Sequence, residues 1–363
     1  MRVLFVRLSA MGDLVQSLGA MQALHAVRPD WPIQVCTQNT LAPLLEQQPG
    51  AWTVIAHDRR GGLRALLATR RRLRHLRCEV AVDLQGNWKS ALVARSAGAP
   101  VIGAAARWRQ EPTSSWLLGR RVAIAGPRHP ALVAATLVQA LAPEAIVQQP
   151  RLFATEAEVQ AAARTVALLG IDAARPFRVV VVSDPADPRG LRSTRLAELA
   201  NGQPTLLLAG PAEEQVQWSV AVPTWRQRPG ELRQLVGLGV LVHRLGGDVV
   251  GPDQGATHVL AACGASTTVL FGPQDPARTA PPGVTVLRRR ELPPCAPCGR
   301  RVCHHPDGPV CMDFGIADSA VMPLPPWLRS PGSPSGPFPR ARGLQRASPR
   351  ASLAADEHGR PSA

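Results

Sequence analysis

The chain has 363 residues, which is enough to bury two hydrophobic cores, and its hydrophobic content of 45% is typical of a globular protein. Its formal charge of +15 at pH 7 favours acidic partners such as phosphorylated glycans or an anionic membrane surface, whereas an aromatic content of 4% and the lack of a nucleic-acid-binding motif argue against nucleic acid. No apolar run is long enough to span a bilayer, and the first residues lack the parts of a signal peptide, so we expect a cytoplasmic protein.

Strand and helix patterns alternate in the first part of the chain. Val3–Val6 is an apolar segment typical of a short buried strand, and a turn at residues 9–13 leads into an amphipathic helix that ends near Val27. We expect further strands at 33–36, 54–56 and 80–83, and helices near 41–47, 63–76 and 88–97. This alternation predicts a parallel sheet that is covered by helices on both faces.

The alternation stops at residues 143–176, a helical stretch with few strand signals. It resumes with apolar strands at 177–182, 205–208 and 267–271. The pattern therefore predicts an α/β protein with two lobes, formed by residues 1–150 and 151–320. Because ligands of parallel sheets bind at the carboxyl ends of the strands, we expect the site to lie between the lobes.

Residues 321–363 differ in composition from the rest of the chain. They are rich in Pro, Ser, Arg and Gly and have no periodic apolar pattern. We expect a disordered tail here, and the sequence leaves open whether this tail is genuine or an out-of-frame extension of the gene.

Asp13 lies where the first strand and turn give way to a helix, and two roles are open to it. Its carboxylate could cap the helix by accepting backbone N–H bonds. It could instead point into the cleft from the end of the first strand and act as a general base. The neighbouring Gly12 would let a ligand approach the backbone closely. The residue pattern alone favours the cap.

A second candidate site is the turn Gly-Pro-Asp-Gln-Gly-Ala-Thr-His at residues 251–258. It follows an apolar strand segment and precedes a helix, so the backbone N–H groups at Gly255 would be free to bind an anion such as phosphate. Asp253 and Thr257 add polar groups at the same end. An ordinary glycine-containing turn explains the pattern equally well, but the rigid loop at 271–278, which would lie beside it, strengthens the phosphate interpretation.

Four cysteines and two histidines occur close together near the end of the second lobe: Cys295, Cys298, Cys303, His304, His305 and Cys311. Thiols at spacings of three, five and eight residues could hold zinc, and a cytoplasmic location argues against stable disulfides. The spacing matches no zinc module that we can name, so a reduced structural loop without metal is favoured. The remaining cysteines are isolated in apolar contexts and are expected in the core: Cys36, Cys78 and Cys263.

Four segments, taken in order, resemble glycosyltransferase family 9, the ADP-heptose:lipopolysaccharide heptosyltransferases. They are VRLSAMGDLVQSLGAMQAL at the start, VAVDLQGNWKSALVARSAGAPVIG at residues 80–103, GPDQGATHVLAACGASTTVLFGPQDPARTAPPG from residue 251, and the cysteine-bearing stretch PCAPCGRRVC. The resemblance covers about residues 1–315.

This resemblance implies a GT-B fold, in which two Rossmann-like lobes face each other across a cleft. It implies an inverting transfer of heptose from ADP-heptose to the lipopolysaccharide inner core, either Kdo-lipid A or an already heptosylated core, with no metal or other cofactor. We expect a monomer, peripheral to the inner face of the cytoplasmic membrane. The basic run at residues 70–77 could contact that membrane or could be a solvated helix face.

The resemblance also assigns roles to individual residues. Asp13 matches the family's proposed general base, which reverses the preference for a helix cap. The donor would be bound by the diphosphate turn, by an acidic residue that contacts the ribose, and by a cation: Asp253, Gln254, Gly255, Ala256, Thr257 and His258, with Glu213 and Arg189. The acceptor would be bound by Ser9, Gly12 and Lys89.

Several positions depart from the family pattern. Arg189 stands where Lys is usual, Leu191 where Trp is usual and Gln254 where Thr is usual. In the first lobe Gln110 replaces a usual Arg and Gly19 a common Pro, and the usual C-terminal helix is not recognisable after about residue 319. These departures leave two alternatives, a catalytically impaired ADP-sugar-binding homologue and a transferase that uses another nucleotide sugar.

Overall fold

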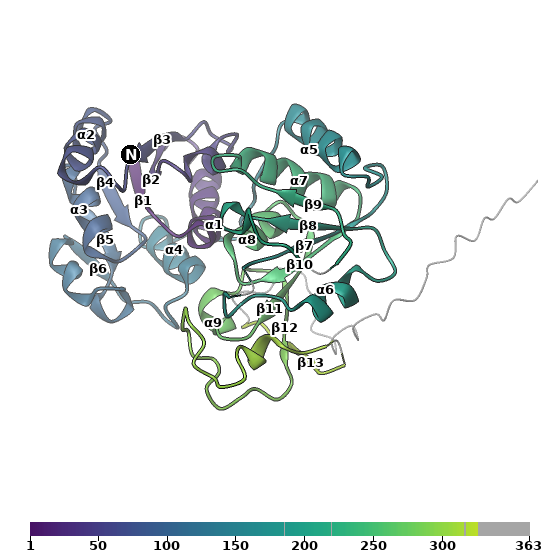
Figure 1. The fold of residues 1–363 in the computed structure, drawn as a ribbon. Helices are drawn as coiled ribbons and strands as arrows, with labels where there is room; N and C mark the ends of the chain where they lie inside the picture. Colours follow the sequence, from purple (N-terminus) through teal and green to yellow (C-terminus); the bar gives the residue numbers. More distant parts are fainter. Residues whose placement is uncertain (185, 219, 316, 326–363) are drawn as a thin grey trace, which may run out of the picture. The chain divides into compact units, whose positions relative to one another are not determined.

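Two mainly parallel sheets organise the chain. The computed structural model describes residues 1–184, 186–218, 220–315 and 317–325 (Figure 1). Both sheets lie in one compact unit. Most of the predicted tail at 321–363 lies outside the described residues.

The first sheet has six parallel strands in the order β3-β2-β1-β4-β5-β6. Its strands are β1 (Val3–Val6), β2 (Ile33–Gln38), β3 (Thr53–His57), β4 (Val80–Asp83), β5 (Val101–Ala104) and β6 (Arg120–Val122). Its helices are α1 (Met11–Val27), α2 (Gly62–His75), α3 (Trp88–Ser96) and α4 (Pro130–Gln139). The predicted helix near 41–47 is only a 3₁₀ turn at Ala42–Leu45.

The central strand β1 shows why this sheet is covered on both faces. All four of its residues are buried, and they alternate between two apolar clusters. Val3 and Phe5 belong to the cluster that includes residues of α1 and α4, whereas Leu4 and Val6 belong to the cluster that includes residues of α2 and α3. The continuous apolar run is therefore a consequence of burial from both sides.

The second sheet has seven strands in the order β13-β12-β11-β10-β7-β8-β9, all paired in parallel except β12 with β13. Its strands are β7 (Arg178–Val181), β8 (Thr205–Ala209), β9 (Thr224–Arg226), β10 (Asp248–Pro252), β11 (Ser266–Phe271), β12 (Thr285–Arg289) and β13 (Ser319–Met322). Its helices are α5 (Glu156–Leu168), α6 (Ser193–Ala200), α7 (Leu232–Arg244), α8 (Gly255–Ala262) and α9 (Pro276–Thr279).

Two sheets of this kind confirm the predicted α/β class. The helical stretch predicted at 143–176 was too long, since only Glu156–Leu168 is helical there. The predicted lobe end at residue 320 falls inside β13, and the assignment of residues 1–150 and 151–320 to separate domains stays a prediction. In the described part of the chain, we find no helix that is both long enough and apolar enough to cross a membrane.

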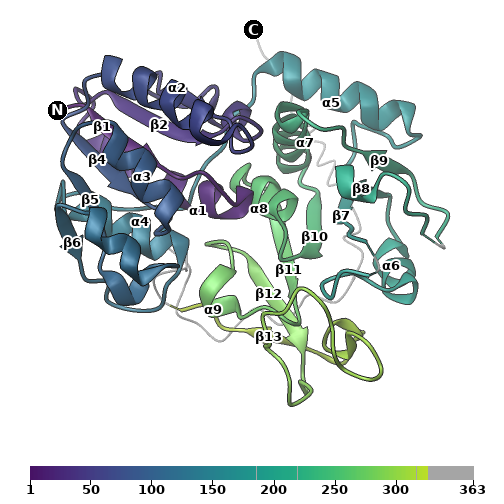
Figure 2. The same cartoon turned by 60° about the vertical axis from the view of Figure 1, so that its left-hand side comes forward.

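Helix α1 lies between the two sheets, beside α8 in both views (Figures 1 and 2). It is buried along most of its length, from Leu14 to Leu24, because it packs against α4 of the first lobe and α8 of the second. Its Gly19 is required by close packing, since a Cβ atom there would lie 2.3 Å from the carbonyl oxygen of Gln148. The departure at this position therefore has a structural reason in this chain.

Candidate functional site

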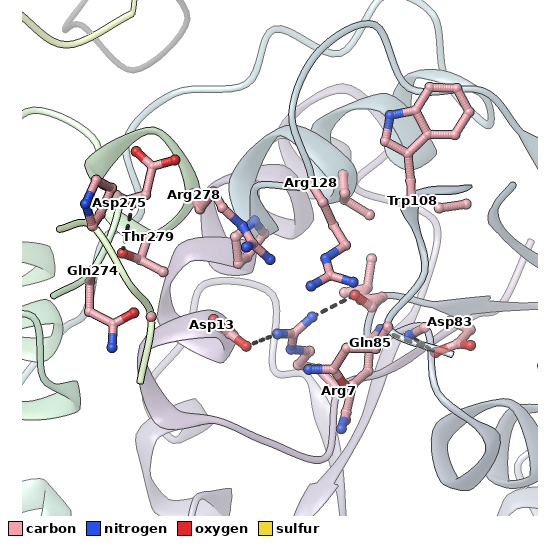
Figure 3. Close-up of a pocket in the computed structure, with 18 of the residues that line it drawn as sticks. Arg7, Asp13, Asp83, Gln85, Trp108, Arg128, Gln274, Asp275, Arg278 and Thr279 are labelled. Atoms are coloured by element: carbon pink, nitrogen blue, oxygen red, sulfur yellow. Dashed lines mark hydrogen bonds and ion pairs between the residues drawn. The ribbon is translucent and has the colours of Figure 1, made fainter. Parts of the chain in front are cut away.

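The carboxyl ends of β1 and β4 build the first part of the site. Val6 and Asp83 are register partners, so Arg7 and Leu84 emerge side by side. The buried Arg7 donates through Nη1 to the Leu84 carbonyl at 2.6 Å and through Nη2 to Oδ2 of Asp13 (Figure 3). The Asp13 side chain is 29% exposed, pairs with Arg7 and lines a cavity. Asp13 is not the N-cap of α1, because Ala10 occupies that position.

Gln85 fixes the turn that carries Ser9. Its Oε1 accepts from the backbone N–H of Leu8 at 2.8 Å and of Ser9 at 3.2 Å, and its Nε2 donates to the Ser9 hydroxyl. The loop after β4 is thereby joined to the turn after β1. Sequence reasoning missed Gln85, although its place directly after a buried strand at the same sheet edge was a usable signal.

A buried ion pair stabilises this loop. The Asp83 and Arg109 side chains are completely buried and meet at 2.6 Å. Asp83 also accepts from the backbone N–H groups of Gln85 and Gly86, and Arg109 donates through Nε to Ser114. Such bonding offsets much of the cost of burying two charges, so the pair holds the loop of Gln85 in one conformation.

Two cavities adjoin Asp13. The first, of about 400 Å³, is lined from the first lobe by Arg7, Asp13, Gln85 and Arg128 and from the second by Asp275 and Arg278, among others. The second, of about 580 Å³, is lined by residues of the first lobe together with Arg301; it includes Ser9, Lys89 and Gln110. Asp13 lines both cavities, and the structure brings it together with the two predicted acceptor residues Ser9 and Lys89.

The predicted diphosphate turn forms the start of α8. His258 bonds through Nε2 to Asp253 at 2.8 Å and through Nδ1 to the amide nitrogen of Gln16 at 3.1 Å. The Gln16 amide donates to Nδ1, so Nε2 carries the proton that is shared with Asp253. The buried Thr257 hydroxyl donates to the Pro252 carbonyl at 2.8 Å, which stabilises the turn, while Gln254 makes no side-chain cap.

Gly12 and Gly255 let this turn approach the start of α1. A Cβ atom on Gly12 would lie 3.1 Å from the His258 ring, and one on Gly255 would lie 3.0 Å from Cβ of Met11. Gly12 therefore faces the turn at Asp253–His258 and lines neither of the two cavities described above. Its assignment to the acceptor residues stays a prediction.

Arg189 and Glu213 also lie in the second lobe, and Arg189 contacts this turn. Arg189 forms a two-point ion pair with Asp187, at 2.9 and 2.6 Å, and donates through Nη1 to the Asp253 carbonyl at 2.9 Å. The hydrogen bond to Asp187 raises the pKa of Arg189, so this guanidinium stays charged. Glu213 is buried just after β8. These residues and Asp253–His258 line neither of the two cavities.

The cysteine cluster gives the zinc interpretation no support. Cys295 and Cys298 are exposed, Cys303 is partly buried and Cys311 is buried, and all are free thiols. Burial, with smaller contributions from the other three thiols, raises the pKa of Cys311 to about 11. Among the residues that the structure describes, no three His, Cys, Asp or Glu side chains group in a way that could hold a metal ion.

The isolated cysteines largely follow the prediction. Cys36 and Cys263 are buried, and burial raises the pKa of each thiol to about 12. Cys78 was also expected in the core, but it is only partly buried.

Besides Gln85, sequence reasoning missed three cations and a second amide at the site: Arg7, Arg128, Arg278 and Gln16. Arg7 could have been found, because it directly follows a buried strand. Arg278 lies in the loop that the sequence had singled out. Nothing in the sequence pattern pointed to Arg128 or Gln16, whose places depend on contacts between distant segments.

The chain is similar to several known proteins. Residues 66–183 match the model of glycosyltransferase family 9 (heptosyltransferase). Lipopolysaccharide heptosyltransferase 1 of Pseudomonas aeruginosa is 25% identical over 335 residues, which are 84% of this chain and 87% of the relative.

Solved structures of such proteins share the fold. A glycosyl transferase family 9 protein of Veillonella parvula has a TM-score of 0.66 at 16% identity, over 77% of this chain and 83% of its own. The ADP-heptose lps heptosyltransferase II of E. coli has a TM-score of 0.60 at 22% identity, over 79% and 90%. E. coli heptosyltransferase WaaC with ADP has a TM-score of 0.58 at 22% identity, over 76% and 89%. These likenesses confirm the predicted GT-B fold with two Rossmann-like lobes.

Proposed function

We propose that this chain, whose residues 66–183 match the model of glycosyltransferase family 9, is a glycosyl-transferring enzyme that moves heptose from ADP-heptose to the lipopolysaccharide inner core, with Asp13 as the general base. The observation that carries the proposal is the position of Asp13. Its carboxylate is partly exposed, is held through Oδ2 by Arg7, and lines two adjoining cavities, each of which receives residues from both lobes.

In the proposed reaction the acceptor hydroxyl attacks the anomeric carbon of the heptose from the face opposite the leaving group. The new C–O bond forms as the bond to the ADP phosphate breaks, so the configuration inverts. Arg7 engages Oδ2 of Asp13, which leaves Oδ1 to accept the hydroxyl proton. ADP departs with the electron pair of the broken bond.

The donor would bind at the start of α8. The backbone N–H groups at Gly255, Ala256 and Thr257 stand at the positive end of the helix dipole, which suits a diphosphate. Glu213 would contact the ribose, and Arg189, Asp253 and His258 would complete the donor side. ADP, which was bound to the E. coli heptosyltransferase WaaC, is the nucleotide to test first.

The charge that develops on ADP would be stabilised by fixed protein groups. The helix terminus and Arg189 would supply positive potential at this place, so the proposed chemistry requires no metal or other cofactor. Arg189 in place of Lys keeps the charge but changes its geometry from a compact ammonium to a planar fork.

The test of this function is transfer of heptose from ADP-heptose to a heptose-deficient core, with Asp13→Asn compared with the unchanged enzyme. We expect kcat to fall about 100- to 10,000-fold, which is the usual contribution of a general base, with little change in ADP binding. Asp58→Asn is the matched control, because Asp58 is an exposed carboxylate of the same lobe outside both cavities. Equal rates for Asp13→Asn and the unchanged enzyme would remove Asp13 from the mechanism.

The same assay separates the alternatives. ADP binding by calorimetry without transfer to any core acceptor would identify a catalytically impaired homologue, as the changes at Arg189, Leu191 and Gln254 suggest. Transfer from a UDP- or GDP-sugar in place of ADP-heptose would identify a different donor.

We also propose that α2 makes the peripheral contact with the inner membrane face. The helix carries five arginines and no acidic residue, and Leu63 and Leu67 are 71% and 49% exposed. Such a surface complements anionic lipid. We expect Arg70→Glu/Arg71→Glu/Arg74→Glu to reduce sedimentation with anionic vesicles, and Arg164→Glu/Arg175→Glu/Arg228→Glu in the second lobe to leave it unchanged. Equal sedimentation of both triple variants would contradict the assignment to α2.

A further inference from the structure

Two arginines from distant parts of the chain converge on the cavity of Asp13. Arg128 lies just before α4, and Arg278 lies in α9 of the second lobe. Both line the cavity of about 400 Å³ together with Arg7 and Asp13. Figure 3 shows their side chains extending into the space beside the Arg7–Asp13 pair.

The carboxylates of Asp13 and Asp83 near these two arginines already form ion pairs with other arginines. Arg7 is paired with Asp13, and Arg109 with Asp83. Among the described residues neither Arg128 nor Arg278 has a carboxylate partner; Arg128 donates only to the Arg109 carbonyl, at 3.0 Å.

The positive charge of Arg278 disfavours the charged form of Arg128. Burial, and then the positive charges of Arg278 and Arg7, lower the pKa of Arg128, while Asp13 opposes them. Asp275, the nearest acidic residue in sequence to Arg278, accepts from the backbone N–H of Ala277 and so caps α9. A substrate anion placed between the two guanidinium groups would relieve this repulsion.

We infer that Arg128 and Arg278 form a subsite for an oxyanion, a carboxylate or phosphate group carried by the acceptor next to the hydroxyl that attacks. The inference rests on the proposed function and names the chemical class of acceptor. Guanidinium groups bind such oxyanions with two parallel hydrogen bonds. We assign the oxyanion to the acceptor and not to the donor, because the turn that would bind the donor diphosphate, Asp253–His258, does not line this cavity.

Binding of inorganic phosphate tests the subsite without any turnover. In calorimetry with saturating ADP, which would occupy the donor turn, we expect phosphate to bind the unchanged enzyme. The double variant Arg128→Gln/Arg278→Gln should bind phosphate about tenfold or more weakly than the unchanged enzyme does. Arg95→Gln/Arg164→Gln is the control, with one exposed arginine removed from each lobe outside the cavity. Equal phosphate affinity in the cavity variant and the unchanged enzyme would overturn the subsite, as would phosphate affinity abolished by ADP.

Steady-state kinetics then separate the two substrates. We expect each single variant to raise the KM for the acceptor about tenfold, with the Kd for ADP unchanged. Arg128→Lys should recover part of the affinity, and melting temperatures show whether a variant has merely lost its fold. A change confined to donor affinity would assign the anion to the diphosphate and overturn the acceptor subsite. A failure of the proposed function is distinguishable, because it would remove transfer in the unchanged enzyme while phosphate binding persists.

Discussion

Arg7, a buried guanidinium at the end of β1, determines where the Asp13 carboxylate lies. A carboxylate in the first turn of a helix has free backbone N–H groups within reach, which is why the local pattern favoured a cap. In the folded chain β4 runs beside β1 and brings the Leu84 carbonyl to Arg7. That bond orients the guanidinium toward Asp13, so a contact across 77 residues outweighs the local preference.

Substitution of Arg7 therefore tests a positioning role. We expect Arg7→Met to lower kcat about 10- to 100-fold with much smaller changes in both KM values, because the base would lose its fixed orientation. Arg7→Lys should retain part of the activity. Steady-state kinetics and melting temperatures are the measurements; a variant that melts earlier but turns over normally when folded would show that Arg7 is only structural.

At the scale of elements, the starts of α1 and α8 meet through two glycines. Neither Gly12 nor Gly255 needs a left-handed backbone; both are required by the approach of neighbouring side chains. This contact places the general-base candidate of one helix beside the end of the other that we propose to bind the donor diphosphate. The packing of two helix termini, one from each lobe, is what turns two separate motifs into one candidate site.

Gly255→Ala tests this contact. A Cβ atom there would lie 2.4 Å from Cε and 3.0 Å from Cβ of Met11. We expect a loss of about 1–3 kcal/mol in the free energy of unfolding and weaker ADP binding, as overpacking separates the two helices. Gly119→Ala is the matched control, because the nearest atom there is 3.6 Å away. Denaturant unfolding measures the change in stability, and calorimetry measures the change in ADP binding. Adding Met11→Ala should partly restore the stability of Gly255→Ala. Equal stability and ADP binding of Gly255→Ala and Gly119→Ala would refute the close approach.

At the scale of the whole described unit, buried polar contacts join the lobes. Gln16 in α1 bonds to both His258 and the Thr279 carbonyl, and His129 before α4 bonds to the Ala280 carbonyl at 3.0 Å. His129 also accepts through Nδ1 from the backbone N–H of Ala131, so its ring is neutral. An apolar cluster with residues of both lobes, among them Leu14 and Leu260, surrounds these contacts.

The neutral His129 ring predicts a pH dependence of stability. Burial lowers the pKa of His129 from 6.5 to about 4. Below pH 6.5 the unfolded chain therefore binds a proton that the folded chain does not, and stability falls as the pH decreases toward 4, by about 3 kcal/mol for this group. Denaturant unfolding between pH 7 and pH 4 measures the slope. His129→Gln should be less stable at pH 7 but less sensitive to pH, and equal slopes would exclude His129 as the cause.

The sequence by itself determined the local parts of this protein. Apolar runs such as Val3–Val6 and the glycine turn before α8 fixed where strands end and helices begin, and the order of four motifs pointed to the family. Edge strands such as Arg120–Val122 and Thr224–Arg226 escaped prediction, because short, partly exposed segments carry little apolar signal.

Only the tertiary structure decided which side chains share the site. Gln16 and His258 meet across 242 residues, and Arg128 and Arg278 line one cavity from opposite lobes. Their positions depend on sheet register and on the packing of α1 against α8, which no local pattern encodes. The physical reason is that hydrogen bonds and charge pairs act over a few ångströms, so their partners exist only after the chain has folded.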